Sequence, residues 1–134
     1  MSAAGDGPGA LSADWILENT GLAAPTRVNI PEWGGAVYVR EMSGVERDAF
    51  ELASMVGEGK GTHFSRENIR ARLAVACVCN ERGELLFGPA QAAQLGQKSA
   101  RALNRIWEVA APLNGLTDAD VEALAGNSDA DRSA

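Results

Sequence analysis

Two cysteines and one histidine carry the most reactive side chains in this sequence. Cys77 and Cys79 are separated by a single residue, and His63 is the only histidine. As zinc ligands the three would be an unusual set, because Cys-x-Cys with one His lacks the spacing of structural zinc sites. A cysteine nucleophile activated by His63 is an alternative, although no further motif accompanies it. The pattern favours a loop histidine and two small buried thiols, with no metal and no cofactor.

A glycine-rich segment, Gly57-x-Gly59-x-Gly61, lies just before the histidine. It lacks the spacing of a P-loop or of a dinucleotide-binding loop, and it follows a predicted helix where those motifs follow a strand. We therefore predict a mobile connector. The carboxylates occur mainly on helix faces and at helix starts, and no pair stands out as an acid–base couple. The sequence thus predicts a protein that is not an enzyme.

Charge is the next feature that constrains the function. The chain has 12 Lys and Arg against 18 Asp and Glu, and the acidic excess lies at its two ends. Arg66, Arg70 and Arg72 form a basic cluster on a predicted helix, which we interpret as a solvated face or a docking surface for an acidic segment, such as this chain's own C-terminal end. A nearly neutral body argues against nucleic acid as a partner. The longest apolar run, Leu73–Cys79, is too short to span a membrane.

The elements that position these residues are predicted to form an α+β fold that is predominantly helical, with about five helices and two short β-hairpins. A single domain would cover residues 11–125, between a disordered N-terminal segment (1–10) and a flexible acidic tail (126–134). No secretory signal is visible, and the expected location is the cytosol.

The hairpins are predicted from turn residues and alternation. The first joins the strands 27–30 and 36–41 through Gly34-Gly35. The second would turn at Asn80–Gly83, between a strand formed by Val75, Cys77 and Cys79 and a return strand at 84–87.

Helix starts and apolar faces come from capping signals and from the helical period. Ser12 caps a short helix at 13–19, and Ser65 caps a helix that runs to about Val75. One longer helix follows the Ser43–Glu46 capping box, and a second long helix starts at Lys98. A second capping box, Thr117–Asp120, opens a two-turn helix that ends at Ala125. The predicted buried stripes are Val45, Ala49, Leu52, Ala53 and Val56 in the first long helix, and Ser99, Leu103, Ile106, Trp107, Ala110 and Leu113 in the second.

Several segments, in the same order along the chain, carry a family resemblance. The first is Pro31-Glu-Trp-Gly-Gly-Ala-Val-Tyr-Val-Arg-Glu-Met-Ser-Gly-Val-Glu-Arg-Asp-Ala-Phe-Glu; the later ones are Arg70-Ala-Arg-Leu, Asn80-Glu-Arg-Gly-Glu-Leu-Leu-Phe, Leu95-Gly-Gln-Lys-Ser-Ala and Leu113-Asn-Gly-Leu. With the helix at 11–22 they cover roughly residues 11–125. The chain resembles the tail assembly chaperones of long, non-contractile-tailed phages and prophages.

This resemblance implies a viral protein that acts in the host bacterial cytoplasm and is absent from the mature virion. It would bind the tape measure protein, keep its apolar helices soluble and promote assembly of the tail tube. The tail tube protein would be recruited through a longer, frameshifted form of the chain, and homo-oligomers are expected. A structural head–tail or tail virion component is the alternative function.

A holdase needs exposed apolar surface for its client together with charge for solubility. The two terminal helices are short, and isolated helices of two turns are marginally stable in water, so the first must dock on something through Trp15, Ile16 and Leu22. We predict that these helices supply the partner-binding surface, with candidate residues Trp15, Ile16, Leu116, Val121 and Leu124.

Overall fold

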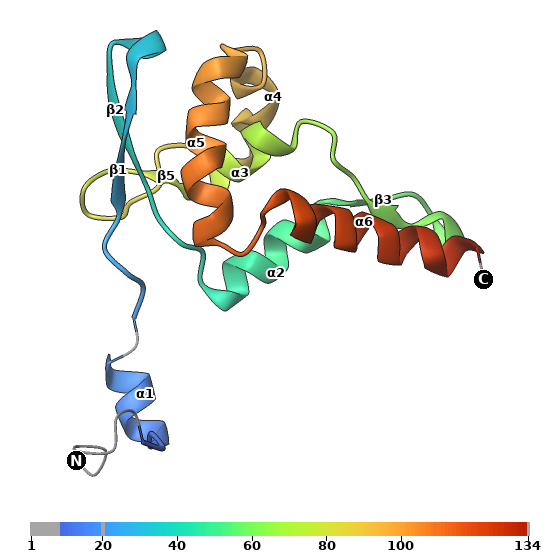
Figure 1. Cartoon of the computed structure of the whole chain (residues 1–134), viewed down its shortest axis with the longest axis horizontal. Helices are drawn as coiled ribbons and strands as arrows, with labels where there is room; N and C mark the ends of the chain where they lie inside the picture. The colour runs from blue at the N-terminus through green and yellow to red at the C-terminus, as the bar shows by residue number, and fades with distance from the viewer. Residues whose placement is uncertain (1–8, 20, 134) are drawn as a thin grey trace.

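The computed structural model describes residues 9–19 and 21–133, and for residues 127–133 it describes the backbone alone. The elements are α1 (Ala13–Asn19), β1 (Thr26–Ile30), η1 (Pro31–Trp33), β2 (Gly35–Val39), α2 (Gly44–Ala53), β3 (Met55–Val56), η2 (Gly59–Gly61), β4 (His63–Phe64), α3 (Ile69–Cys77), β5 (Val78–Cys79), η3 (Pro89–Gln91), α4 (Ala92–Leu95), α5 (Ala100–Leu113) and α6 (Asp118–Ser133). The helix-dominated α+β fold is as predicted (Figure 1). Most of the N-terminal segment predicted to be disordered, residues 1–8, lies outside the described residues.

The β1–β2 hairpin forms where the sequence predicts it. The two strands pair antiparallel from Thr26 opposite Val39 to Ile30 opposite Gly35. Pro31 has no amide hydrogen to donate and begins the 3-10 turn η1 that joins them. Gly34 ends this turn with φ of 72°, a conformation that glycine adopts without steric conflict. In Figure 1 the hairpin lies along one side of α5, and β1 and β2 both contact that helix.

The second predicted hairpin is only partly present. Its turn forms, since the amide of Gly83 donates to the carbonyl oxygen of Asn80 at 2.9 Å. The return strand, however, is limited to one isolated bridge between Cys79 and Leu85. β5 pairs mainly with β2, with Cys79 opposite Tyr38, and completes a three-stranded sheet of order β1-β2-β5. The chain before β5 remains helical as far as Cys77, which leaves β5 too short for a full hairpin.

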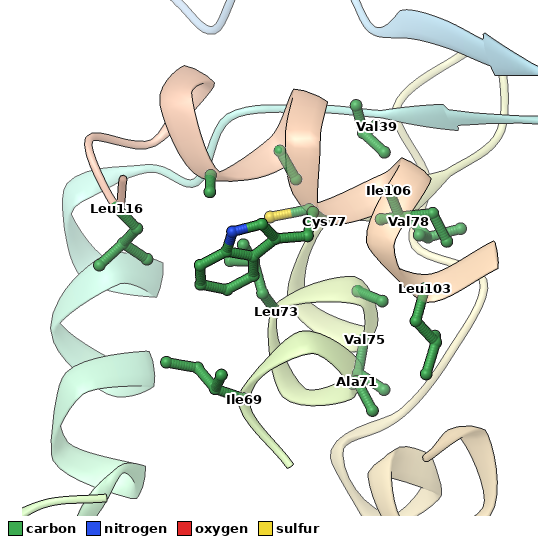
Figure 2. Packing of buried hydrophobic residues seen from close by; sticks show 14 of the residues in the cluster. Val39, Ile69, Ala71, Leu73, Val75, Cys77, Val78, Leu103, Ile106 and Leu116 are labelled. Atoms are coloured by element: carbon green, nitrogen blue, oxygen red, sulfur yellow. The ribbon is translucent and has the colours of Figure 1, made fainter. Parts of the chain in front are cut away.

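The hydrophobic core lies where α3 and α5 pack on each other and on the inner face of the sheet (Figure 2). Fully buried alanines, including Ala71, Ala74, Ala102 and Ala110, lie on these two helices. Small side chains of this kind allow two helix axes to approach closely. Leu73, Ile106 and other large side chains fill the remaining space. The middle of the predicted α5 stripe is buried as expected, from Leu103 to Ala110, but its two ends, Ser99 and Leu113, are exposed.

The buried face of α2 is the reverse of the predicted one. Val45 is 81% exposed and Leu52 76% exposed, and Ala49, Ala53 and Val56 also face solvent. The helix ends at Ala53 and its continuation is strand β3. The predicted core stripe of this helix is therefore wrong, and it forms an apolar surface instead.

Polar anchors explain why α2 turns this way. The capping box of Ser43 and Glu46 forms as predicted. Glu46 also accepts from Arg40 at 2.6 Å, and Arg47 donates to the backbone carbonyl of Asn114. These contacts hold the charged side of α2 against the body. Phe50, which the stripe did not include, is the buried hydrophobic residue of the helix at 8% exposure.

The segment predicted as a mobile loop forms the compact β3–β4 hairpin. Met55 pairs with Phe64 and Val56 with His63, around the 3-10 turn η2. Gly57 has φ of 95°, and a Cβ there would lie 2.4 Å from the carbonyl oxygen of Gly61. Only glycine fits at this position, because the obstacle is backbone.

The boundaries of α3, α5 and α6 also differ from the predicted ones. α3 begins at Ile69 after Asn68, and Ser65 bonds the amide of Glu67 in the preceding turn. α5 begins after an N-cap at Ser99, which was predicted to be a core residue, and it ends at Leu113. α6 starts at the predicted Thr117–Asp120 capping box and continues past Ala125 to Ser133, in a segment without proline.

Candidate functional site: an apolar groove beside α2

An open apolar groove lies between α2, α3 and the segment 85–92. Its volume is about 440 Å³. The groove is lined by Glu46, Ala49, Phe50, Ala53, Arg72, Val75, Ala76, Leu85, Phe87, Pro89 and Ala92. Most of these side chains are apolar, so the groove suits a hydrophobic segment of a partner better than it suits a charged metabolite.

The exposed stripe of α2 extends this groove over the surface. Ala49 and Ala53 belong to both, while Val45 and Leu52 continue the apolar area along the helix. We call the groove together with Val45, Leu52, Val56 and Leu86 the groove surface. Contiguous apolar areas of this kind on soluble proteins mark interaction sites.

Arg72 provides a positive charge at the wall of the groove. Its Nε donates to the carbonyl oxygen of Glu67 at 2.9 Å, and its two Nη atoms donate to the hydroxyl of Ser54 and to the carbonyl oxygen of Ser65. The guanidinium also lies 5.8 Å from the ring centroid of Phe50. These partners are neutral. Burial lowers the pKa of Arg72, and the more distant charge of Glu67 opposes this effect.

A second, more polar cavity of about 560 Å³ lies beyond Arg72. It shares Ala53, Arg72 and Ala92 with the groove, and Asn68 and Gln97 are among its other wall residues. The basic cluster was predicted to face outward, but Arg72 does not face outward with the others: it lines both cavities. A partner in the groove could therefore reach a guanidinium that is already held in place by neutral acceptors.

The other members of the basic cluster contact α5 and α6. Arg66 forms an ion pair of 2.7 Å with Glu122 of α6, so an acidic residue of the C-terminal segment does dock on the cluster. Arg70 lies 5.5 Å from the ring centroid of Trp107 and donates to Asn104.

The predicted partner-binding residues fall into two groups. Trp15 and Ile16 are exposed on α1, a helix without any buried residue. Leu116 is fully buried, Val121 is buried as well, and Leu124 packs against the core. The structure therefore places Leu116 and Val121 inside the domain, where no partner reaches them. Val121 lies on the side of α6 that faces Ile69 and Trp107. Leu116 lies in the connection between α5 and α6 and belongs to the core.

α1 does not dock on the domain as predicted. In Figure 1 it lies apart from the body, joined by the segment that leads into β1. Trp15 and Leu22 are exposed, and Leu17 is 84% exposed. The amide of Ala23 donates to Glu41 Oε1 at 2.9 Å and ties the connecting segment to the body.

The two thiols lie at the end of α3 and in β5, and both are buried. Burial raises the pKa of Cys77 to about 12, although the nearby Arg40 and a 3.4 Å hydrogen bond from Asn114 Nδ2 favour the thiolate. Burial also raises the pKa of Cys79. His63 Nδ1 lies 2.8 Å from the carbonyl oxygen of Gly61, at the β3–β4 turn. Within the described part of the chain, no three His, Cys, Asp or Glu side chains gather as a metal site requires.

We expect both thiols to resist labelling in the native protein. At pH 8 an alkylating reagent should modify Cys77 and Cys79 at least tenfold more slowly than in urea, because the thiolate is the reactive form and both sulfurs are buried. Cys77 also makes stability fall with rising pH: the unfolded thiol ionises near its ordinary value of 9.0 and the folded one near 12, so its contribution is lost across that interval. Rapid native labelling would contradict this and revive a cysteine nucleophile.

Sequence reasoning missed the groove because it placed α2 the wrong way round. Two signals pointed to it. Phe50 lies off the α2 stripe, and Leu85, Leu86 and Phe87 are three consecutive apolar residues that a half-buried strand would not contain.

Comparison with protein-family models, with curated proteins and with solved structures found no match for this chain. Among the helices of the described residues, none is both long and apolar enough to cross a membrane.

Proposed function

We propose that this protein is a non-enzymatic tail assembly chaperone of a phage or prophage, which binds the tape measure protein in the host bacterial cytoplasm and promotes tail tube assembly. Two things support the proposal: the resemblance of residues 11–125 to that family, and the groove surface. The chain would leave the assembled tail and be absent from the virion. Recruitment of the tail tube protein through a longer frameshifted form is part of the same proposal.

The observation that carries the proposal is the exposed apolar stripe of α2 above the groove. Val45, Ala49 and Leu52 repeat at the helical period, yet they face solvent. A long amphipathic helix is the partner that such a stripe beside a groove accommodates, since its apolar face can lie along both. The many charges elsewhere on the surface would keep the loaded chaperone soluble.

Co-expression with the tape measure protein of the same genome tests this function. The soluble fraction of the tape measure protein should rise severalfold with the intact chain and much less with the double variant Val45→Ser/Leu52→Ser. Both positions are exposed, so the variant should retain its thermal midpoint. Trp33→Ser, which removes an exposed apolar residue from the β1–β2 turn, is the matched control.

Equal solubility with and without the chain would refute the chaperone function. Mass spectrometry of purified particles separates it from the alternative, because a structural virion component would be present in them in stoichiometric amounts.

A further inference from the structure

We infer that α1 of one copy of this chain docks on the groove surface of a second copy, and that reciprocal exchange of the two α1 helices forms a dimer. α1 would occupy the surface proposed above for the client, so the two would exclude each other there; the dimer itself is argued from other observations. Both halves of the interface lie on the same chain: no residue of α1 is buried, and Val45 and Leu52 of the groove surface are exposed.

The first half of the interface is α1 itself. Leu11, Trp15, Leu17 and Leu22 are exposed on a short segment in which no residue of the helix is buried. A seven-residue helix with this much exposed apolar surface has little stability of its own in water. It gains stability when that surface is covered, and the body of its own chain does not cover it (Figure 1).

The second half is the groove surface, which matches α1 in size and character. α2 has ten residues, a length of about 15 Å, and α1 has seven, about 10 Å. The groove floor includes Phe50, Val75 and Phe87, which offer contacts for a large side chain such as Trp15. An amphipathic helix laid in an apolar groove is a recurrent mode of recognition.

Charge complementarity favours α1 over an arbitrary apolar segment. The chain before Arg27 has no Lys or Arg, and α1 carries Asp14 and Glu18 one helical turn apart. The wall of the groove carries Arg72, which takes part in none of the ion pairs formed among the described side chains. A carboxylate of α1 would give this guanidinium its first charged partner in the groove.

The connection between α1 and the body favours exchange between copies. Only residues 20–22 separate α1 from Ala23, whose amide is bound to Glu41. Three extended residues reach about 10 Å, which limits how far α1 can turn back over its own body. In the structure α1 lies apart from the domain (Figure 1). Reciprocal docking would give a closed, two-fold symmetric pair.

Light scattering with size-exclusion chromatography on the full chain tests the dimer. We expect a concentration-dependent dimer for the intact protein. The arm variant Trp15→Ser/Leu17→Ser and the groove variant Val45→Ser/Leu52→Ser should each raise the dimer dissociation constant at least tenfold. All four positions are exposed, so both variants should keep the circular dichroism spectrum and thermal midpoint of the parent. Trp33→Ser is the control and should dimerise normally.

A mixture of the two variants makes the test specific. The arm variant retains an intact groove and the groove variant an intact arm, so the mixture should form a heterodimer joined by one exchanged helix, which either variant alone cannot form. Asp14→Lys/Glu18→Lys should weaken dimerisation severalfold. A monomer at all concentrations, a dimer unaffected by either variant, or a mixture without heterodimer would overturn the inference.

Discussion

Phe50→Ala should lower the free energy of unfolding by about 3 kcal/mol, whereas Leu52→Ala should change it by less than about 0.5 kcal/mol. The two residues are two positions apart on α2, and the substitutions remove side chains of similar hydrophobicity. Phe50 is 8% exposed and contacts Arg72, while Leu52 is 76% exposed. The difference reflects which side of α2 faces the core.

Urea denaturation of the two variants beside the parent protein measures this difference directly. Equal m-values would show that the comparison concerns stability alone. If Leu52→Ala proved the more damaging change, α2 would pack with its apolar stripe inward. That result would also remove the groove surface, and with it the observation that carries the proposed function.

Asn114→Ala should destabilise the protein by about 2 to 4 kcal/mol, a large effect for one polar side chain. Its Oδ1 accepts from the amide of Met42 at 2.6 Å, and its Nδ2 donates to the carbonyl oxygen of Ala110 at 2.9 Å and to Cys77 Sγ. The substitution leaves the Met42 amide and the Cys77 sulfur without these bonds next to the core. Removing one partner from a poorly hydrated hydrogen bond penalises the fold more than removing both.

Asn104→Ala is the matched control, because it deletes the same kind of amide from within α5, whereas Asn114 is the C-cap of that helix. Asn104 accepts one exposed hydrogen bond from Arg70. It should cost less than about 1 kcal/mol. Thermal and urea unfolding of the two variants would report the contrast. Equal, small effects would mean that water replaces the Asn114 bonds and that α2 is positioned by other contacts.

The sequence correctly predicted helix caps and turns, because these depend on residues that are neighbours in the chain. Two capping boxes, the Ser12 cap of α1 and the β1–β2 turn at Gly34 all form as expected. The middle of the α5 stripe was also correct, because α5 packs by its apolar face; Ser99 and Leu113 lie at the ends of the helix, where the core no longer covers them.

The α2 stripe was misplaced because a helical period reports which residues share a face, and it does not report which face is buried. The ion pair of Arg40 with Glu46 and the bond from Arg47 to Asn114 join residues that are far apart in the sequence or lie outside the helix. No periodicity contains that information. The same limit applies to Leu116, which lies between α5 and α6 in the chain and is buried in the core, and to the β3–β4 hairpin, which requires Gly57 at positive φ.

The candidate site was predicted only in part. Exposure of Trp15 and Ile16 agrees with a binding role, which stays a prediction. The groove surface was not predicted: Phe50 and the run from Leu85 to Phe87 indicated apolar residues without a place in the predicted core, but only the tertiary fold brings α2, α3 and the segment 85–92 together.

The isolation of α1 divides the sequence into two parts with different constraints. Residues from β1 onward form one packed core, so most substitutions there act first on the stability of the fold. α1 contributes no buried residue to that core. Substitutions in it therefore leave the packing of that core unchanged, so the sequence of α1 can vary with less effect on folding than the sequence of the domain.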